Sequence, residues 1–336
     1  MTKTGTAGAA LAALLCLAAA GPAFAEDDVT LAIPALSLSF SSTYIAQDQG
    51  YWSKAGLAVK LVDIPGIGAT NAVLAGSVDF ANASGPTAIR APARGQKLLS
   101  IAAIADRMVM ETVLSKSAAD AAGIDNSSDP AKKIHALRGK KMAVETVNSI
   151  VHGYLRYVAR KGGVDPERDI AVSPMQPPAM LAALKTGAID GFTMSMPWPL
   201  LPVHDGTAIR ISSGPRGDTP ELNPFAFTVI VTKPETCDKR PTVCQRLVSG
   251  IGQAFTYMHE HPQESLALLT KRLPAMDPAI FAEGFELQRI STPKTPHIEE
   301  ASLTKAQDFM LATNMMTPEE KLASFKDIYT NKFADK

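Results

Sequence analysis

The sequence contains the same arrangement of residues twice, 111 positions apart. Residues 72–86 read AVLAGSVDFANASGP, and residues 183–197 read ALKTGAIDGFTMSMP. In each copy an apolar stretch with helical spacing ends at a glycine, Gly76 or Gly187, and an aspartate follows three positions later and a proline ten positions later. Glycine commonly ends helices because it adopts the left-handed conformation at little cost. A matched pair of such segments indicates two similar structural units in one chain.

The residues around both copies follow the same order of expected elements. Strands alternate with short helical patterns, which is typical of a parallel α/β sheet. Strands are expected at 28–36, 56–64, 77–84 and 96–105 in the first unit, and at 139–145, 169–175 and 188–194 in the second. Helices are expected between these strands, because the apolar residues there recur with helical spacing. The expected fold class is therefore α/β, with two lobes.

Two further segments match each other and are expected to join the units. Residues 110–119 (METVLSKSAA) and 225–235 (FAFTVIVTKPE) both contain Thr-Val, an aliphatic residue and then a lysine. We interpret them as hinge strands that cross between the lobes near Val113 and Val229. This interpretation gives the lobe limits, which are 26–113 with 226–336 for lobe I and 114–225 for lobe II.

The C-terminal part of the chain is expected to be helical. From residue 242 to residue 333 the sequence consists of amphipathic runs with proline breaks between them, and the last run is 318–333. These helices are expected to pack on the first lobe, to which the chain has returned.

The first 25 residues have the composition of a secretory signal peptide. Lys3 precedes an apolar run that is shorter than the ~20 residues needed to span a bilayer, and small residues lead up to Ala25. We expect cleavage after Ala25 and export to the periplasm.

The overall charge excludes several classes of partner. Lys and Arg together number 33, and so do Asp and Glu, so the chain has no net field to attract nucleic acid or a membrane surface. Aromatic residues make up 6% of the chain, which argues against stacking on single-stranded nucleic acid. We expect a monomer with no nucleic-acid partner.

The exported chain would retain two cysteines, Cys237 and Cys244. An oxidising compartment favours a local disulfide between them. Metal binding is the alternative, but it would need further ligands, and no His or Cys cluster supplies them.

The sequence lacks common catalytic signatures. It contains no G-x-x-x-x-G-K-[ST], G-x-S-x-G, H-E-x-x-H or C-x-x-C motif. Asp79 and Asp190 have equivalent places in the two units, and we interpret both as structural, each accepting backbone N–H bonds from its own neighbouring turn. We therefore expect no enzymatic activity and no cofactor or metal.

Three loop-to-helix junctions carry small polar residues, at 39–43 (SFSST), 65–70 (PGIGAT) and 145–149 (ETVNS). The N–H groups at helix starts bind anions or polar acceptors. In open α/β sheets these junctions lie at the carboxyl ends of strands, where ligands bind. Ordinary helix capping explains any one of them. Junctions from both lobes that face one cleft would favour a binding site.

Several of these segments resemble a known family. YIAQDQGYWSKAGLAVKLV, GATNAVLAGSVDFA, LRGKKMAVE and LKTGAIDGFTMSMPW are similar to nitrate/sulfonate/taurine-type substrate-binding proteins of ABC importers, a group that includes pyrimidine-precursor (THI5-like) binders. The resemblance extends from Val29 to about Phe225. It implies a type II periplasmic binding-protein fold, in which two α/β lobes are joined by two hinge strands and hold a ligand between them. It also implies a membrane permease as partner.

The resemblance also implies which residues contact the ligand. In the first lobe they follow the first three strands, and in the second lobe they follow the corresponding strands and reach the return crossover. The predicted contacts are Ser39, Ser41, Thr43, Gly68, Ala69, Thr70, Ser84 and Gly85, together with Thr146, Asn148, Ser149, Thr193, Met194, Trp198, Asn223 and Phe225.

These residue types favour a small organic anion as the ligand. Hydroxyl groups beside Met194, Trp198 and Phe225 suit a sulfonate or carboxylate with an apolar or aromatic body, which Trp198 would cover. An arginine could add a positive charge, but the sequence does not place the candidates Arg90, Arg107 and Arg216. A pyrimidine-precursor binder, an enzyme on the same fold and a sensory partner of a membrane kinase remain alternatives, because all could share the fold.

Overall fold

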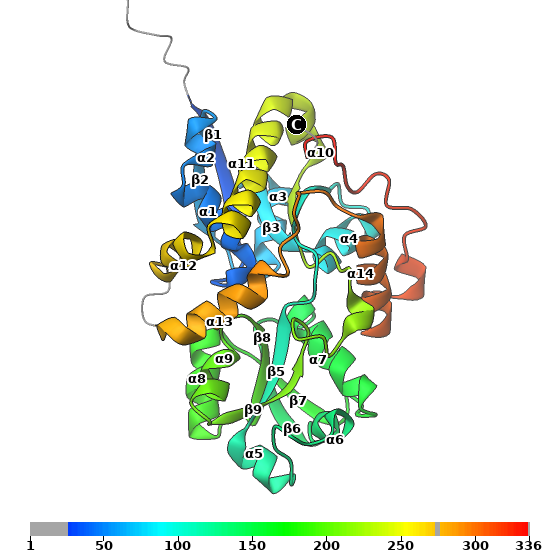
Figure 1. Cartoon of the computed structure of the whole chain (residues 1–336). Coiled ribbons are helices and arrows are strands. Elements are labelled where there is room, and N and C mark those ends of the chain that lie inside the picture. The colour runs from blue at the N-terminus through cyan, green and yellow to red at the C-terminus, as the bar shows by residue number, and fades with distance from the viewer. Residues whose placement is uncertain (1–25, 273–275, 335–336) are drawn as a thin grey trace, which may run out of the picture.

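The computed structural model describes residues 26–272 and 276–334, so the predicted signal peptide lies outside the described residues. Figure 1 shows two lobes, one above the other, each with a sheet covered by helices. Within the described ranges no helix is both long enough and apolar enough to cross a membrane.

The first lobe contains a five-stranded sheet. From edge to edge its strands are β2 (Leu57–Asp63), β1 (Asp27–Ile33), β3 (Phe80–Ser84), β10 (Thr228–Thr232) and β4 (Leu99–Ala105). β1 runs parallel to β2 and β3, as expected, whereas β10 is antiparallel to β3 and β4. The sheet is therefore mixed, because β10 enters it only after the chain has passed through the second lobe.

The second lobe repeats this arrangement. The order of its sheet is β7 (Ile170–Pro174), β6 (Lys140–Val144), β8 (Gly191–Ser195), β5 (Met110–Ser115) and β9 (Ala208–Ser213). β5 is antiparallel to β8 and β9, and thus has the place that β10 has in the first sheet. The expected equivalence of the segments around β5 and β10 is confirmed. β9 was not expected.

The two proposed hinge strands do not themselves cross between the lobes. β5 pairs only within the second sheet and β10 only within the first. The chain passes between the sheets at 106–109 and 214–227, so Val113 and Val229 lie inside the sheets and the limit drawn at residue 113 falls within β5. The exact lobe limits remain a prediction.

The duplicated segments adopt the same conformation. α3 (Gly68–Ala75) and α8 (Pro177–Thr186) end at Gly76 and Gly187, whose φ angles are 77° and 73°. Only glycine adopts this left-handed conformation without strain. The repeated unit that the sequence predicts is therefore present.

The other helices of the two lobes lie on either side of the sheets (Figure 1). They are α1 (Ser41–Asp48), α2 (Tyr51–Lys54), α4 (Gly85–Ala93), α5 (Lys116–Ala121), α6 (Pro130–His135), α7 (Ile150–Lys161) and α9 (Leu200–His204), with short 3-10 turns η1 (Leu38–Phe40) and η2 (Pro220–Leu222).

The two equivalent aspartates are structural, but their partners differ from those expected. Asp79 Oδ2 accepts bonds from the backbone N and the hydroxyl of Thr30 in β1, at 2.8 and 2.7 Å. Asp190 Oδ2 accepts a 2.8 Å bond from the backbone N of Lys141 in β6. Each carboxylate therefore ties the start of its strand to the neighbouring parallel strand, β1 or β6, rather than to its own turn.

The C-terminal helices extend over both lobes rather than the first alone. They are α10 (Pro234–Lys239), α11 (Pro241–Glu260), α12 (Pro262–Thr270), α13 (Pro278–Arg289) and α14 (Glu300–Ala312). α11 and α12 pack on α1, whereas α13 contacts α9 and α14 contacts α7, which both belong to the second lobe.

The last expected helix, 318–333, is absent apart from the 3-10 turn η3 (Pro318–Glu320). The main chain of Leu322 instead exchanges two hydrogen bonds with the side chain of Gln307, at 2.9 and 3.1 Å. Phe325, Ile328 and Phe333 are buried, so the apolar residues that suggested a helix fill the core from an irregular segment.

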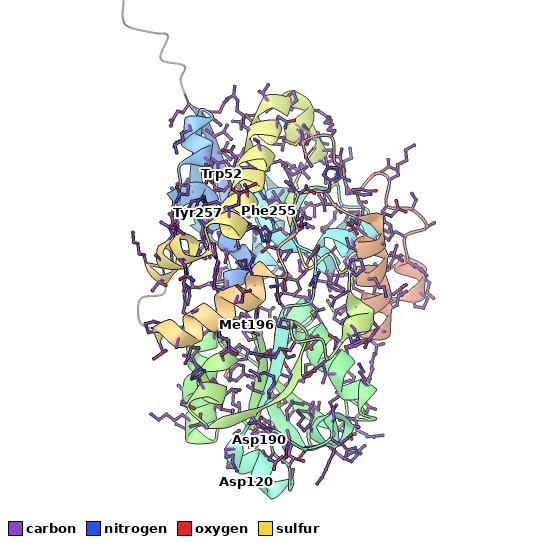
Figure 2. All side chains as sticks on the ribbon, in the orientation of Figure 1. Trp52, Asp120, Asp190, Met196, Phe255 and Tyr257 are labelled. Atoms are coloured by element: carbon purple, nitrogen blue, oxygen red, sulfur yellow. A yellow bond between two sulfur atoms is a disulfide. The ribbon has the colours of Figure 1, made fainter. Side chains whose placement is uncertain are left out.

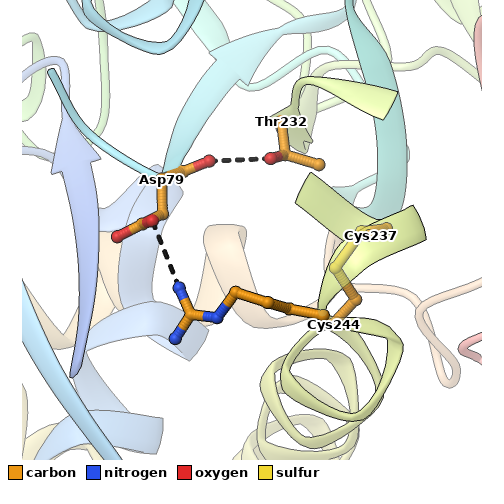
Figure 3. The surroundings of a disulfide bond; sticks show 5 residues. Asp79, Thr232, Cys237 and Cys244 are labelled. Atoms are coloured by element: carbon orange, nitrogen blue, oxygen red, sulfur yellow. Dashed lines mark hydrogen bonds and ion pairs between the residues drawn. A yellow bond between two sulfur atoms is a disulfide. The ribbon is translucent and has the colours of Figure 1, made fainter. Parts of the chain in front are cut away.

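Cys237 and Cys244 form the expected disulfide, which joins α10 to α11. Figure 3 shows its surroundings, where the Thr232 hydroxyl donates to the carbonyl oxygen of Asp79 at 2.7 Å. Arg240, which lies between the two cysteines, contacts Asp79 Oδ1 at 3.4 Å. The disulfide thus supports the end of the first sheet where β3 begins and β10 ends.

Candidate ligand-binding cleft

A cavity lies between the two lobes, at the carboxyl ends of the parallel strands. Its empty space, which includes solvent at its mouth, is about 630 Å³. Both lobes contribute to its wall. The lining residues are Pro34, Ala35, Ser37, Ser39, Phe40, Gly66, Ile67, Thr70, Ala83, Ser84, Thr87, Met110, Glu145, Ser149, Ile150, Val151, Met194, Ser195, Phe227 and Thr228.

The polar part of the wall consists mainly of hydroxyl groups, and several are held in place by caps at helix starts. Ser84 Oγ accepts a bond from the backbone N of Thr87 at the start of α4. Ser149 Oγ accepts a bond from the backbone N of His152 at the start of α7. α3 begins beside Thr70. Starts of helices from both lobes therefore face the cavity, and each carries the positive end of a helix dipole.

One ionisable side chain lines the cavity, that of Glu145, which follows β6. Its Oε1 atom is buried and has no hydrogen-bond partner among the described residues. Burial raises the pKa of this carboxyl to about 7, because the ionised form loses its hydration. Glu145 is therefore close to half-protonated near neutral pH.

Three basic residues on α4 and α7 lie close to the loop that contains Glu145, but their hydrogen bonds and ion pairs are with residues other than Glu145. Arg90 Nη1 donates to the carbonyl oxygen of Asn148 at 3.2 Å. Arg156 contacts Asn148 Oδ1 and Glu167. Burial lowers the pKa of His152 to about 4, with a smaller contribution from Arg156, so His152 is neutral at pH 7 and its Nδ1 accepts from the Asn148 backbone N.

The lobes touch each other beside the cavity. The hydroxyls of Ser37 and Ser195 lie 2.9 Å apart, and the backbone N of Leu38 donates to the carbonyl oxygen of Met196 at 3.2 Å. Figure 2 shows Met196 at the junction of the lobes, whereas Asp190 lies near the far end of the second lobe. The two lobes are therefore in direct contact at this side of the cavity.

Glycines permit two close approaches near the cavity, one between the lobes and one within the first lobe. A Cβ atom on Gly66, whose φ is 56°, would lie 2.9 Å from the hydroxyl oxygen of Thr146 in the other lobe. A Cβ atom on Gly85 would lie 1.9 Å from the carbonyl oxygen of Ala226. A side chain at Gly85 would force its main chain away from that of Ala226, and a side chain at Gly66 would displace the side chain of Thr146.

The structure places part of the predicted contact set in the cavity wall. The predicted residues that line it are Ser39, Thr70, Ser84, Ser149 and Met194. They come from both lobes, as expected. Whether they contact a ligand remains a prediction.

The other predicted contacts lie outside the lining and have structural partners instead. Ser41 Oγ donates to the carbonyl oxygen of Leu38 at 2.6 Å, and Thr43 Oγ1 donates to Asn82 at 3.3 Å. Gly68 and Ala69 begin α3 without reaching the cavity, and Ala69 is fully buried. These residues face the interior because each successive residue of a helix is rotated by about 100°.

The same holds in the second lobe and at the return crossover. Thr193 Oγ1 pairs with Thr112 at 2.8 Å, on the strand face opposite to Met194. Trp198 is buried and donates to a first-lobe carbonyl, so it does not cover the cavity. Asn223 Oδ1 accepts from the backbone N of Met108, at 3.4 Å.

Phe225 is also part of the core, where its ring meets Phe309 edge-on at 5.3 Å. Thr146 and Asn148 lie at the junction of the lobes, beside Gly66 and Arg90. Gly85 lies against the main chain of Ala226 within the first lobe, and none of these three residues lines the wall.

None of the arginines considered from the sequence lines the cavity. Arg90 lies beside it, on Asn148. Arg107 pairs with Asp106, and Arg216 contacts Glu111 and Glu283. In the described part of the chain no group of three or more His, Cys, Asp or Glu side chains could hold a metal ion.

Sequence reasoning missed Glu145, Ser37, Ser195, Thr87 and Thr228. Glu145 and Ser195 stand at the carboxyl ends of their strands, which is the signal that could have identified them. A glutamate after a strand is more often at a solvated surface, so its type alone did not indicate a cavity.

Comparison with known proteins agrees with this architecture. Residues 37–265 match the family described as NMT1/THI5 like. The bicarbonate transport ATP-binding protein CmpC of Synechocystis sp. is 30% identical over 238 residues, which are 68% of this chain but 35% of that protein, so the chain spans about a third of its length.

Two solved structures have the same fold. The alkanesulfonate-binding protein SsuA from Xanthomonas axonopodis pv. citri, bound to MOPS, has a TM-score of 0.71 and 17% identity, and the match covers 92% of this chain and 100% of that one. The periplasmic nitrate-binding protein NrtA from Synechocystis has a TM-score of 0.68 and 16% identity, with 90% and 84% covered. The chain therefore belongs to the NMT1/THI5-like family and has the two-lobed periplasmic binding-protein fold.

Proposed function

We propose that this protein is the periplasmic receptor of an ABC importer and that it binds a small organic solute between its lobes. The observation that carries the proposal is the cavity between the lobes, whose wall comes from both of them. A solute that contacts both lobes binds the closed form better than the open one, and so favours closure. A membrane permease would receive the closed, loaded protein.

The predicted ligand is a small organic anion, a sulfonate or carboxylate with an apolar or aromatic body. Hydroxyls such as those of Ser39 and Thr70 can donate to its acidic oxygens, and the starts of α3, α4 and α7 favour negative charge. Phe40, Ile150 and Met194 would contact its body. The alkanesulfonate-binding protein SsuA, which has the same fold, supports this class.

A pyrimidine-type compound is the second candidate, and Glu145 favours it. An amino-substituted pyrimidine presents an N–H donor, and a carboxylate oxygen can accept a hydrogen bond from it. The cavity wall supplies this carboxyl but no lysine or arginine.

Cleavage after Ala25 would release the chain into the periplasm, where it would act as a monomer. With β5 assigned to the second sheet, lobe I would comprise 26–109 and 226–336, and lobe II 110–225. The proposal includes no catalytic step. Product formation from a bound ligand, detected by mass spectrometry, would favour the enzyme alternative.

A thermal-shift screen tests the proposal. The mature protein is melted with sulfonates, aromatic carboxylates, nitrate and pyrimidines. A ligand present at 100 times its Kd is expected to stabilise the folded protein by about 2.7 kcal/mol. The proposal would be contradicted if no compound of these classes raised the melting temperature at millimolar concentration.

A further inference from the structure

Glu145 is an uncompensated carboxyl in the wall of the cavity. Its Oε1 atom is buried and has no partner among the described residues. Among the described residues, no lysine, arginine or histidine lines the cavity with it. A buried carboxylate that lacks a partner is costly, so a residue of this kind is expected to find its partner elsewhere.

The cations near Glu145 are already engaged. Arg90, on α4, donates to the Asn148 carbonyl, and Arg156, on α7, is held by Glu167 at 2.7 Å. His152, also on α7, accepts a hydrogen bond through Nδ1, so that nitrogen carries no proton and the imidazole ring is neutral. The protein thus provides hydrogen-bond donors to a ligand through its hydroxyls and helix starts, but at Glu145 it provides an acceptor.

We infer that Glu145 is a specificity-determining residue that accepts a hydrogen bond from an N–H group of the ligand, so that the cavity selects amino-bearing organic solutes over their unsubstituted counterparts. This inference rests on the proposed function, because it assigns the ligand class of the same cavity. It is compatible with an acidic group elsewhere on the ligand, which the hydroxyls would bind.

Because Glu145 is buried, the direction in which protons are exchanged on ligand binding tests this interaction. The pKa of the empty site is about 7. An N–H donor stabilises the ionised carboxylate and lowers its pKa, so binding at pH 7 releases protons. A ligand that instead presented an anionic oxygen to Glu145 would raise the pKa, and binding would take protons up.

The test uses matched probes that differ by an amino group. The pairs are 4-aminobenzenesulfonate with benzenesulfonate, 4-aminobenzoate with benzoate, 2-aminoethanesulfonate with ethanesulfonate, and 4-aminopyrimidine with pyrimidine. Calorimetry measures the Kd of each for the parent protein, Glu145→Gln, Glu145→Asp and the control Glu264→Gln. Glu264 is an exposed residue of α12.

The parent and the control are expected to bind the amino member of at least one pair at least tenfold more tightly. In Glu145→Gln this preference should fall below threefold, and Glu145→Asp should restore part of it. Binding of the amino member by the parent should release protons at pH 7, measured in buffers of different ionisation enthalpy, and the release should vanish in Glu145→Gln.

Thermal melts establish that each variant is folded. If Glu145→Gln does not fold, the direction of proton exchange in the parent and the preference of Glu145→Asp decide the question. Equal binding of both members of every pair, or proton uptake with the amino member, overturns the inference and leaves the proposed function standing. If the parent binds none of the probes, the proposed function fails and the inference falls with it.

Discussion

The indole N–H of Trp198, in the second lobe, donates a 3.0 Å hydrogen bond to the carbonyl oxygen of Leu36 in the first lobe. Both residues lie at the junction rather than in the cavity wall. A bond between lobes is present only when they are together, so it stabilises the closed form and, through it, ligand binding.

Replacing Trp198 with alanine is therefore expected to weaken ligand binding at least tenfold, although its ring does not line the cavity. The change removes a hydrogen bond worth about 1 kcal/mol and the packing of a buried ring, so the melting temperature also falls. Trp198→Phe, which keeps most of the packing, should weaken binding less and melt closer to the parent. Calorimetry and thermal melting measure both effects. Unchanged affinity in both variants would show that this contact does not support closure.

Asp190→Asn is expected to act on stability rather than on binding. The amide oxygen is a weaker acceptor than the carboxylate for the Lys141 N–H, so unfolding should become easier by about 1 kcal/mol. Asp79→Asn should cost more, because Asp79 also accepts from the Thr30 hydroxyl and contacts Arg240. Denaturant melts give the two values, and equal values would contradict this ranking.

Replacing both Cys237 and Cys244 with serine is expected to lower stability by about 2 kcal/mol, because a short loop is no longer closed in the unfolded chain. Ligand affinity should remain within twofold of the parent, since neither residue lines the cavity. Thiol titration of the mature parent should find no free cysteine before reduction. A large loss of affinity in the double variant would contradict the peripheral role of the disulfide.

Glu145→Gln is expected to change how stability depends on pH in the absence of ligand. The folded-state pKa of Glu145, about 7, is above its usual value of 4.5. The parent therefore binds this proton more tightly when folded, and the associated stability is present below pH 4.5 and is lost as the pH rises through 7. The loss is at most ~3 kcal/mol, and solvent access makes it smaller.

Glutamine does not titrate, so the parent should lose stability relative to Glu145→Gln between pH 5 and pH 8. Melting temperatures at the two pH values measure the difference, and Glu264→Gln serves as the control, since it should follow the parent. Parallel profiles for the parent and Glu145→Gln would mean that the carboxyl is not destabilised by burial.

The sequence predicted those features that depend on local patterns. Gly76 and Gly187 marked the ends of equivalent helices, and the strands before and after them were placed because their apolar residues alternate or form short runs. The position of the cavity followed from the general placement of ligands at the carboxyl ends of strands.

Local sequence patterns did not predict the features that depend on tertiary packing, such as the orientation of side chains on a helix and contacts between distant residues. Ser41 and Thr43 precede or begin a helix in sequence, but the rotation of that helix decides which hydroxyl reaches the cavity. Trp198 contacts Leu36, which is 162 positions away, and no local pattern encodes such a contact. The segment after Pro318 has apolar residues at helical spacing, yet Gln307 bonds to its main chain and holds it in an irregular course.

The central claim is that a solute binds between the lobes and is contacted by hydroxyls from both. Calorimetric titration of a ligand from the thermal-shift screen into the double variant Thr70→Val/Ser149→Ala tests it most directly, with Thr304→Val/Ser324→Ala, two exposed positions, as the matched control. The account predicts binding at least tenfold weaker than in the parent for the first variant and unchanged binding for the control. Parent-like affinity in the folded Thr70→Val/Ser149→Ala protein would contradict the claim.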